Sequence, residues 1–214
     1  MNNKPTVSIA IGTTMFARYA DLPNTVSHAI AEFIDNALQS YRNNKDYFQS
    51  TNPDFRFKVT IDFNWNTDDN RARKITISDN AGGLNFASFQ KAFMTAETPE
   101  DNKGLNEFGM GMKTAAGWLG NKWSVRTSAI GEPVERFYEF DLQYVLENDV
   151  KELPYDEIPS SESSHYTIVT IEEPTKNSPS QKSVDKIKLE LASIYRQSLR
   201  ANEMDLFVDG EPLS

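Results

Sequence analysis

The stretch that decides the fold of this chain is Glu32-Phe33-Ile34-Asp35-Asn36. It lies within residues 25–42, where apolar residues recur every three and four positions, a spacing that predicts an amphipathic helix. Glu32 and Asn36 are four residues apart, so the helix stacks them on one face with apolar neighbours, and we expect that face to point inward. A buried carboxylate is costly and needs a reason. A general base acting on water would be one, and Asn36 offers an amide oxygen suited to Mg²⁺. Taken alone, the stretch is more simply an amphipathic helix with polar residues near its edge.

A second patch, Asp79-Asn80-Ala81-Gly82-Gly83, follows an expected strand at 74–79 that pairs as a hairpin with an expected strand at 55–64. A carboxylate at a strand end can accept a hydrogen bond from an exocyclic amine such as adenine N6. The glycines allow the backbone to approach a flat ring closely. An ordinary Asp-Asn-Gly turn is the simpler interpretation of this patch alone.

The third patch is Phe108-Gly109-Met110-Gly111-Met112-Lys113, directly before an expected helix at 112–119. Loop amides and a helix N-terminus together form an anion cradle, to which Lys113 would add charge. Gly-x-Gly is common by itself. The patch is not a Walker loop, because Gly-x-x-x-x-Gly-Lys-Ser/Thr is absent, and no βαβ unit surrounds it as a Rossmann site requires.

The remaining pattern predicts an α+β fold. We expect it to be a two-layer sandwich with helices packed on one face of a mixed, largely antiparallel sheet. Residues 12–23 look irregular, and residues 43–54 and 147–164 are polar and read as loops. Further strands are expected at 7–11, 122–129, 136–142, 166–171 and 206–208, and further helices at 86–93 and 183–199.

Composition narrows the class of protein. The chain has 214 residues and a net charge of −9, which disfavours tight DNA binding through its bulk surface. It has no cysteine and two histidines, His28 and His165, so a disulfide framework or a Cys/His metal site is not expected. We expect His165 at a surface or strand edge. No apolar run has the length of a membrane span and the N-terminus is unlike a signal peptide, so we expect a cytoplasmic protein without membrane contact.

In this order and at these distances, the three patches resemble the GHKL ATPase superfamily, which includes gyrase B-type topoisomerases, the ninety-kilodalton heat-shock chaperone, histidine kinases and MutL. The resemblance covers about residues 25–171. The family motif Asp-x-Gly-x-Gly departs at Ala81, and Asn106 stands where many relatives have glycine. A threonine that opens a late strand in the family is matched by Thr167.

The resemblance implies ATP and Mg²⁺ as ligands and a role for each matching residue. Glu32 would be the general base and Asn36 the Mg²⁺ ligand. Asp79 would read adenine, with Gly83 beneath the ring and Thr167 behind it. Residues 93–108 would form a lid over the nucleotide. The residues implied along the phosphates are Gly109, Gly111, Met112 and Lys113, and those that complete the implied nucleotide contacts are Ser40, Leu84, Phe108 and Met110.

Within the superfamily the pattern is most similar to MORC-type ATPases, on the segments 27–37, 108–120 and 198–210. This similarity implies a homodimer when ATP is bound, and DNA or protein clients reached through further C-terminal regions. We expect an ATP-binding domain at 1–180 and, at 181–214, a helix and strand leading toward a second domain of a longer protein. That second domain would supply a lysine to the γ-phosphate, so slow hydrolysis is expected here. A nucleotide-gated binding module with little turnover, and a degenerate domain that binds no nucleotide, are the alternatives.

Overall fold

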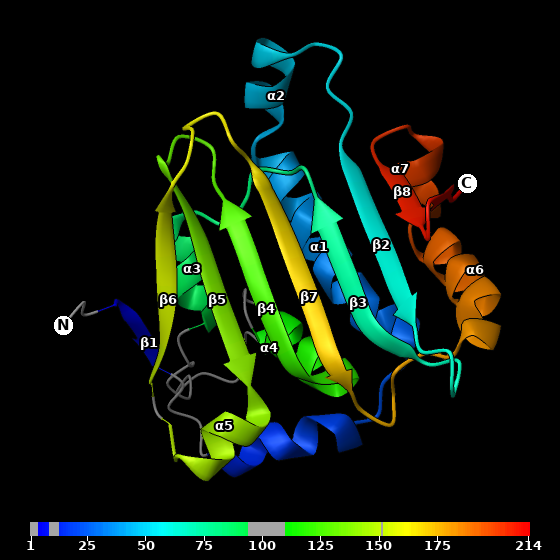
Figure 1. Cartoon of the computed structure of the whole chain (residues 1–214). Coiled ribbons are helices and arrows are strands. Elements are labelled where there is room, and N and C mark those ends of the chain that lie inside the picture. Colours follow the sequence, from blue (N-terminus) through cyan, green and yellow to red (C-terminus); the bar gives the residue numbers. More distant parts are fainter. Residues whose placement is uncertain (1–3, 9–12, 94–109, 151) are drawn as a thin grey trace, which may run out of the picture.

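A computed structural model describes residues 4–8, 13–93, 110–150 and 152–214. Within these residues, nine strands form one sheet in the order β1-β6-β5-β4-β7-β3-β2-β8-β9 (Figure 1). All neighbouring strands are antiparallel except β2 and β8, which are parallel. The strands are β1 (Thr6–Ser8), β2 (Lys58–Trp65), β3 (Ala72–Asp79), β4 (Gly120–Ser128), β5 (Val134–Asp141), β6 (Glu152–Pro159), β7 (Tyr166–Pro174), β8 (Asp205–Val208) and β9 (Glu211–Pro212).

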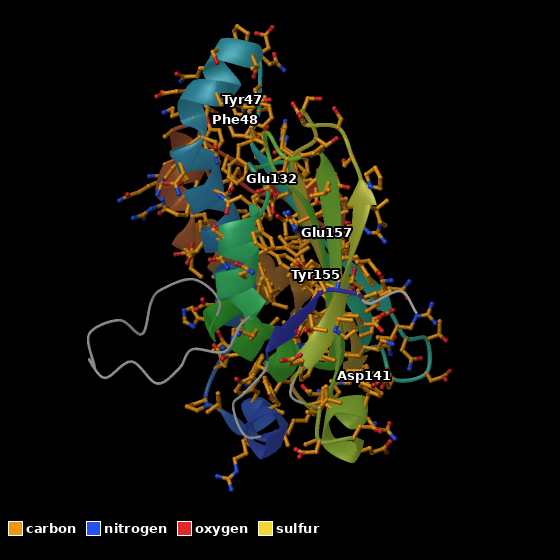
Figure 2. The ribbon with its side chains drawn as sticks, turned by 90° about the vertical axis from the view of Figure 1, so that its left-hand side faces the viewer. Tyr47, Phe48, Glu132, Asp141, Tyr155 and Glu157 are labelled. Carbon is orange, nitrogen blue, oxygen red and sulfur yellow. The ribbon has the colours of Figure 1, made fainter. Side chains whose placement is uncertain are left out.

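The helices lie against one face of this sheet. Figure 2 shows the two layers edge-on. Tyr155 lies in the sheet, and Tyr47 and Phe48 mark the upper end of the helical layer. The α+β two-layer prediction is therefore confirmed. The helices are η1 (Thr13–Asp21), α1 (Val26–Asn43), α2 (Lys45–Thr51), α3 (Phe86–Phe93), α4 (Met110–Leu119), α5 (Leu142–Glu147), η2 (Gln181–Ser183), α6 (Val184–Ile194) and α7 (Arg196–Arg200).

Alternating side chains explain why the sheet is covered on one face only. Along β2, Val59, Ile61 and Phe63 are buried, while Lys58, Asp62 and Asn64 are exposed. This period of two buries one apolar row under the helices and leaves a polar row on the open face. Helix α1 supplies the opposing apolar stripe, in which Ile30 and Ile34 are fully buried.

The C-terminal residues belong to the same sheet and core. Strand β8 pairs in parallel with β2, in the register Val59↔Leu206 and Ile61↔Val208. Leu206 and Val208 are buried in the common core. Helices α6 and α7 form the crossover between β7 and β8, beside α1 (Figure 1).

Three segments differ from expectation. The stretch expected to be irregular contains η1, whose Phe16 packs on Phe140 with ring centroids 5.0 Å apart. The polar stretch after α1 contains α2, anchored by the buried Phe48. The polar segment 147–164 contains β6, which pairs with β5 on one side and β1 on the other.

Candidate functional site

A pocket lies between α1 and the sheet, with about 570 Å³ of empty space when the part open to solvent is included. Its walls are mostly apolar, and its polar groups come from α1, the end of β3 and the start of β7. Seven of the residues selected from the sequence line it. The full lining is Phe33, Asn36, Ala37, Ser40, Val59, Ile77, Asp79, Gly83, Leu84, Ala92, Met112, Thr167 and Val169.

Helix α1 gives the pocket one wall. The Thr25 side chain caps the helix by accepting a hydrogen bond from the backbone N–H of His28. Asn36 and Ser40 are one turn apart and both reach the pocket. The Ser40 hydroxyl donates to the carbonyl of Gly83 at 3.3 Å, which joins α1 to the loop after β3.

Asp79 lies at the last position of β3, directly opposite Thr167 of β7. Its carboxylate accepts backbone N–H bonds from Ala81, at 2.9 Å, and from Thr167. Burial outweighs these two donors and raises the pKa of Asp79 to about 7. The pocket therefore contains a carboxyl group that gains or loses its proton near neutral pH.

Gly83 follows in the same loop, with a φ of 71°. A Cβ atom on Gly83 would overlap the carbonyl oxygen of Ser128, so any other residue would push the loop off β4. The next residue, Leu84, donates its backbone N–H to the Thr127 hydroxyl at 2.9 Å, and that hydroxyl lies 3.3 Å from the hydroxyl of Thr167. Thr127 is 1% exposed and was not selected from the sequence, because on an alternating strand it looks like any other inward residue.

The outer side of this loop is also held. The Asn80 side chain accepts from the N–H of Lys58 at 2.7 Å and donates to the carbonyl of Arg56 at 2.9 Å. His165 Nδ1 lies 3.0 Å from the Asn80 carbonyl and 3.1 Å from the Ala81 carbonyl. Both neighbours are acceptors, so Nδ1 carries the proton and donates. His165 is thus half-buried and bonded to the loop that carries Asp79, where we had expected a surface or edge position.

Glu32 is exposed, and the expectation that it points inward with Asn36 is wrong. Residues four apart on a helix are offset by about 40°, and here Asn36 lines the pocket whereas Glu32 does not. The Glu32 carboxylate lies against Gly111, where a Cβ atom would overlap Oε2. Loss of water around the carboxylate raises the pKa of Glu32, and the charge of Asp35 raises it further.

Helix α4 begins at Met110, two residues earlier than predicted, so Gly111 belongs to its first turn and not to a preceding loop. Met112 lines the pocket. Lys113 is 4% exposed and does not line the pocket; burial lowers its pKa to about 8. Phe108, Gly109 and the expected lid, apart from Phe93, lie outside the described residues.

Comparison with protein families agrees with this geometry. Residues 24–178, well over half of the chain, match the sequence model of the histidine kinase-, DNA gyrase B- and HSP90-like ATPases. The chain belongs to this family. The matched region includes α1, the loop after β3, α4 and β7, and it carries the ATP-binding domain that gives the family its name. A search of curated proteins found no match.

The family usually binds ATP with Mg²⁺, and the residues present fit that ion. No group of three or more His, Cys, Asp or Glu side chains gathers as a metal site within the described residues. Mg²⁺ commonly keeps several waters and takes only one or two protein ligands beside nucleotide phosphates. The Asn36 amide, which lines the pocket, is a ligand of that kind.

Among the described residues, no helix has both the length and the apolar character needed to cross a membrane.

Proposed function

We propose that this chain binds Mg·ATP in the pocket between α1 and the sheet and hydrolyses it slowly, with Glu32 as the general base. The observation that carries the proposal is Asp79, a buried carboxyl group set among the apolar walls of the pocket. An adenine ring needs apolar surfaces for its faces and an acceptor for its exocyclic amine, and the lining offers both.

The adenine end of the pocket is supported by fixed groups. Asp79 would accept a hydrogen bond from the exocyclic amine. Its carboxylate accepts from the backbone N–H groups of Ala81 and Thr167, and a carboxylate can accept more than two hydrogen bonds. Gly83 and Leu84 would lie along the ring, in a loop held by Thr127. Thr167 would lie behind Asp79, where its N–H keeps the carboxylate in place.

The phosphates would extend toward α1 and the start of α4. Asn36 would hold Mg²⁺, which when bound would neutralise phosphate charge. Ser40 would contribute its hydroxyl, and Met110, Gly111 and Met112 the first turn of α4. Lys113, buried on the same helix, would place a positive charge near the phosphates. Gly109 would also lie along the phosphates, and Phe108 would complete the nucleotide contacts.

Glu32 would remove a proton from the water that attacks the γ-phosphorus as the bond to the ADP oxygen breaks. Its raised pKa makes it a better base than an ordinary glutamate. Among the described lining residues there is no lysine or arginine, so little protein charge would stabilise the transferring phosphoryl group. We therefore expect slow turnover.

The wider context is proposed from the MORC-like sequence pattern. In it, residues 1–180 carry the ATP-binding domain, and residues 181–214, which pack on the same sheet, lead toward a transducer domain. Residues 93–108, which apart from Phe93 lie outside the described residues, would close over the nucleotide, and closure would drive homodimerisation. DNA or protein clients would act through further regions. The alternative is a nucleotide-gated binding and dimerisation module with little turnover, favoured by the exposure of Glu32 and by the lack of lysine and arginine among the described residues that line the pocket.

Calorimetry with Mg²⁺ and a non-hydrolysable ATP analogue tests the proposal. Wild type should bind, and Asp79→Asn should lose most of the affinity because its amide presents a donor or a weaker acceptor to the adenine amine. No binding by wild type would contradict the proposal and favour a degenerate domain.

Turnover of Glu32→Ala separates the two functional classes. Binding retained with turnover abolished supports a hydrolase. If wild type binds without turnover, the nucleotide-gated module is favoured instead. If Glu32→Ala turns over as fast as wild type, Glu32 is not the general base.

A further inference from the structure

Tyr195 connects the C-terminal helices to the helix that carries Glu32 and Asn36. It follows directly after α6 and is 4% exposed. Its hydroxyl lies 2.7 Å from Asp35 Oδ1 and 3.1 Å from the carbonyl of Ala31. A phenol has one proton, and the charged, nearer acceptor takes it, so Tyr195 donates to Asp35.

Asp35 occupies a central place on α1. It follows Glu32 by three residues, a spacing at which side chains on a helix are neighbours, and it directly precedes Asn36. Its charge acts on Glu32 and raises the pKa of that carboxyl group. The Ala31 carbonyl belongs to the same turn. The Tyr195 hydroxyl therefore touches both ends of the one helical turn that contains Glu32.

Other polar contacts join the C-terminal segment to α1 on either side of this turn. Ser27 donates to Glu190 at 2.6 Å near the start of the helix. Arg42 binds both oxygens of Glu203, at 2.9 and 2.8 Å, near its end. These contacts dock the segment, but neither touches a residue of the turn from Ala31 to Asn36.

We propose that Tyr195 is a positioning residue for nucleotide hydrolysis: by holding Asp35, it fixes the α1 turn that presents Glu32 and Asn36 to the phosphates. This inference rests on the proposed function above. It makes the segment 184–200 a working part of the ATP site, although that segment does not line the pocket. A shift of α6 would change the placement of Glu32 and leave the proposed adenine contact of Asp79 unchanged.

Tyr195→Phe removes the hydroxyl and keeps the ring. We expect kcat to fall about tenfold, the effect of losing one hydrogen bond to a charged group. Adenosine, which lacks phosphates, should bind with unchanged affinity. The affinity gained by the non-hydrolysable analogue on adding Mg²⁺ should shrink, because Asn36 is less well held. Circular dichroism and thermal unfolding establish that the variant is folded.

Ser27→Ala is the matched control, since it also removes one hydroxyl–carboxylate bond between α1 and α6. It should leave kcat and the Mg²⁺-dependent gain unchanged. Asp35→Asn changes the acceptor in the hydrogen bond between Tyr195 and Asp35. If Tyr195 acts through Asp35, the double variant Tyr195→Phe/Asp35→Asn should be no slower than Asp35→Asn alone.

The outcomes are distinct. Wild type that fails to bind nucleotide overturns the proposed function and the inference together. Wild type that binds and turns over, with Tyr195→Phe unchanged or with Ser27→Ala equally impaired, overturns the inference alone, as do additive effects in the double variant. If wild type binds without turnover, the Mg²⁺-dependent gain decides: a smaller gain in Tyr195→Phe supports the inference, and an equal gain overturns it.

Discussion

At the scale of single residues, the proposed adenine-binding role of Asp79 implies a pH-dependent affinity. Its carboxylate is desolvated in the pocket, and two backbone N–H groups compensate only in part. An amine donor from a ligand would favour the ionised form, whereas a proton would compete with that donor.

We therefore predict that adenosine affinity falls as the pH is lowered through about 7, the pKa of Asp79. The ionised fraction drops about tenfold per unit below the pKa, so affinity at pH 6 should be about one tenth of that at pH 8. Adenosine has no phosphate that titrates in this range, and NMR titration measures its weak binding. An affinity that stays constant from pH 6 to pH 8 would separate Asp79 from adenine recognition. Asp79→Asn, the control, should bind weakly without this pH dependence.

Gly111 permits the contact between α4 and the Glu32 carboxylate. We predict that Gly111→Ala gains less stability than the roughly 1 kcal/mol that alanine usually adds over glycine in a helix, because the exposed Glu32 side chain must move aside. The Cβ atom would overlap Oε2 of Glu32 and displace it, so turnover should fall as well. Thermal and denaturant unfolding measure the first effect.

The background Glu32→Ala supplies the control for Gly111. With the carboxylate removed, Gly111→Ala should give the full stability gain of about 1 kcal/mol expected for alanine in a helix. An equal change in stability in both backgrounds would mean that the two residues do not touch.

At the scale of elements, much of the fold could be predicted because its signals are local. The period of α1 and the alternation of β2 and β3 each lie within one continuous stretch. Helix α2 gave no such signal, since Phe48 is its only buried residue. Strand β6 was obscured by Pro154 and Pro159, and only Leu153 and Tyr155 face the core. Figure 2 shows Tyr155 on this strand, turned toward the helical layer.

The candidate site, like the fold, could be predicted from the sequence only where its signals are local. The motif residues that line the pocket lie in recognisable patches, but the residues that hold those patches do not. Thr127 meets Leu84 across 43 residues, and Tyr195 meets Asp35 across 160. In the sequence, Tyr195 looks like one more member of the apolar face of its helix. Contacts of this kind depend on the tertiary fold, which periodicity does not encode.

His165 gives a prediction for the loop after β3 as an element. We expect His165→Ala to weaken nucleotide binding about fivefold, the scale of one neutral hydrogen bond, although the side chain does not line the pocket. The lost donor to Asn80 and Ala81 would loosen the loop that carries Asp79. Calorimetry with the ATP analogue measures the change. His28→Ala, at an exposed position outside the loop, is the control and should bind as wild type does.

At the scale of the whole molecule, the proposed dimer can be tested directly. Sedimentation with and without the ATP analogue and Mg²⁺ should show a monomer that becomes a dimer when nucleotide is bound. Asp79→Asn should stay monomeric at concentrations where wild type dimerises, because it lacks the ligand that shifts the equilibrium. A sedimentation coefficient that nucleotide leaves unchanged would argue for a monomeric nucleotide-binding protein.

The parallel pairing of β8 with β2 bears on how the protein emerges during synthesis. Val59 of β2 is a wall of the pocket, and its partner Leu206 lies far downstream in the sequence. Until β8 has been synthesised, β2 has an unpaired edge. The hairpin of β2 and β3 can form early, but a pairing this distant in sequence forms slowly. A nascent chain would thus carry every motif of its proposed nucleotide site while the edge of β2, which forms one wall of the pocket, is still uncovered.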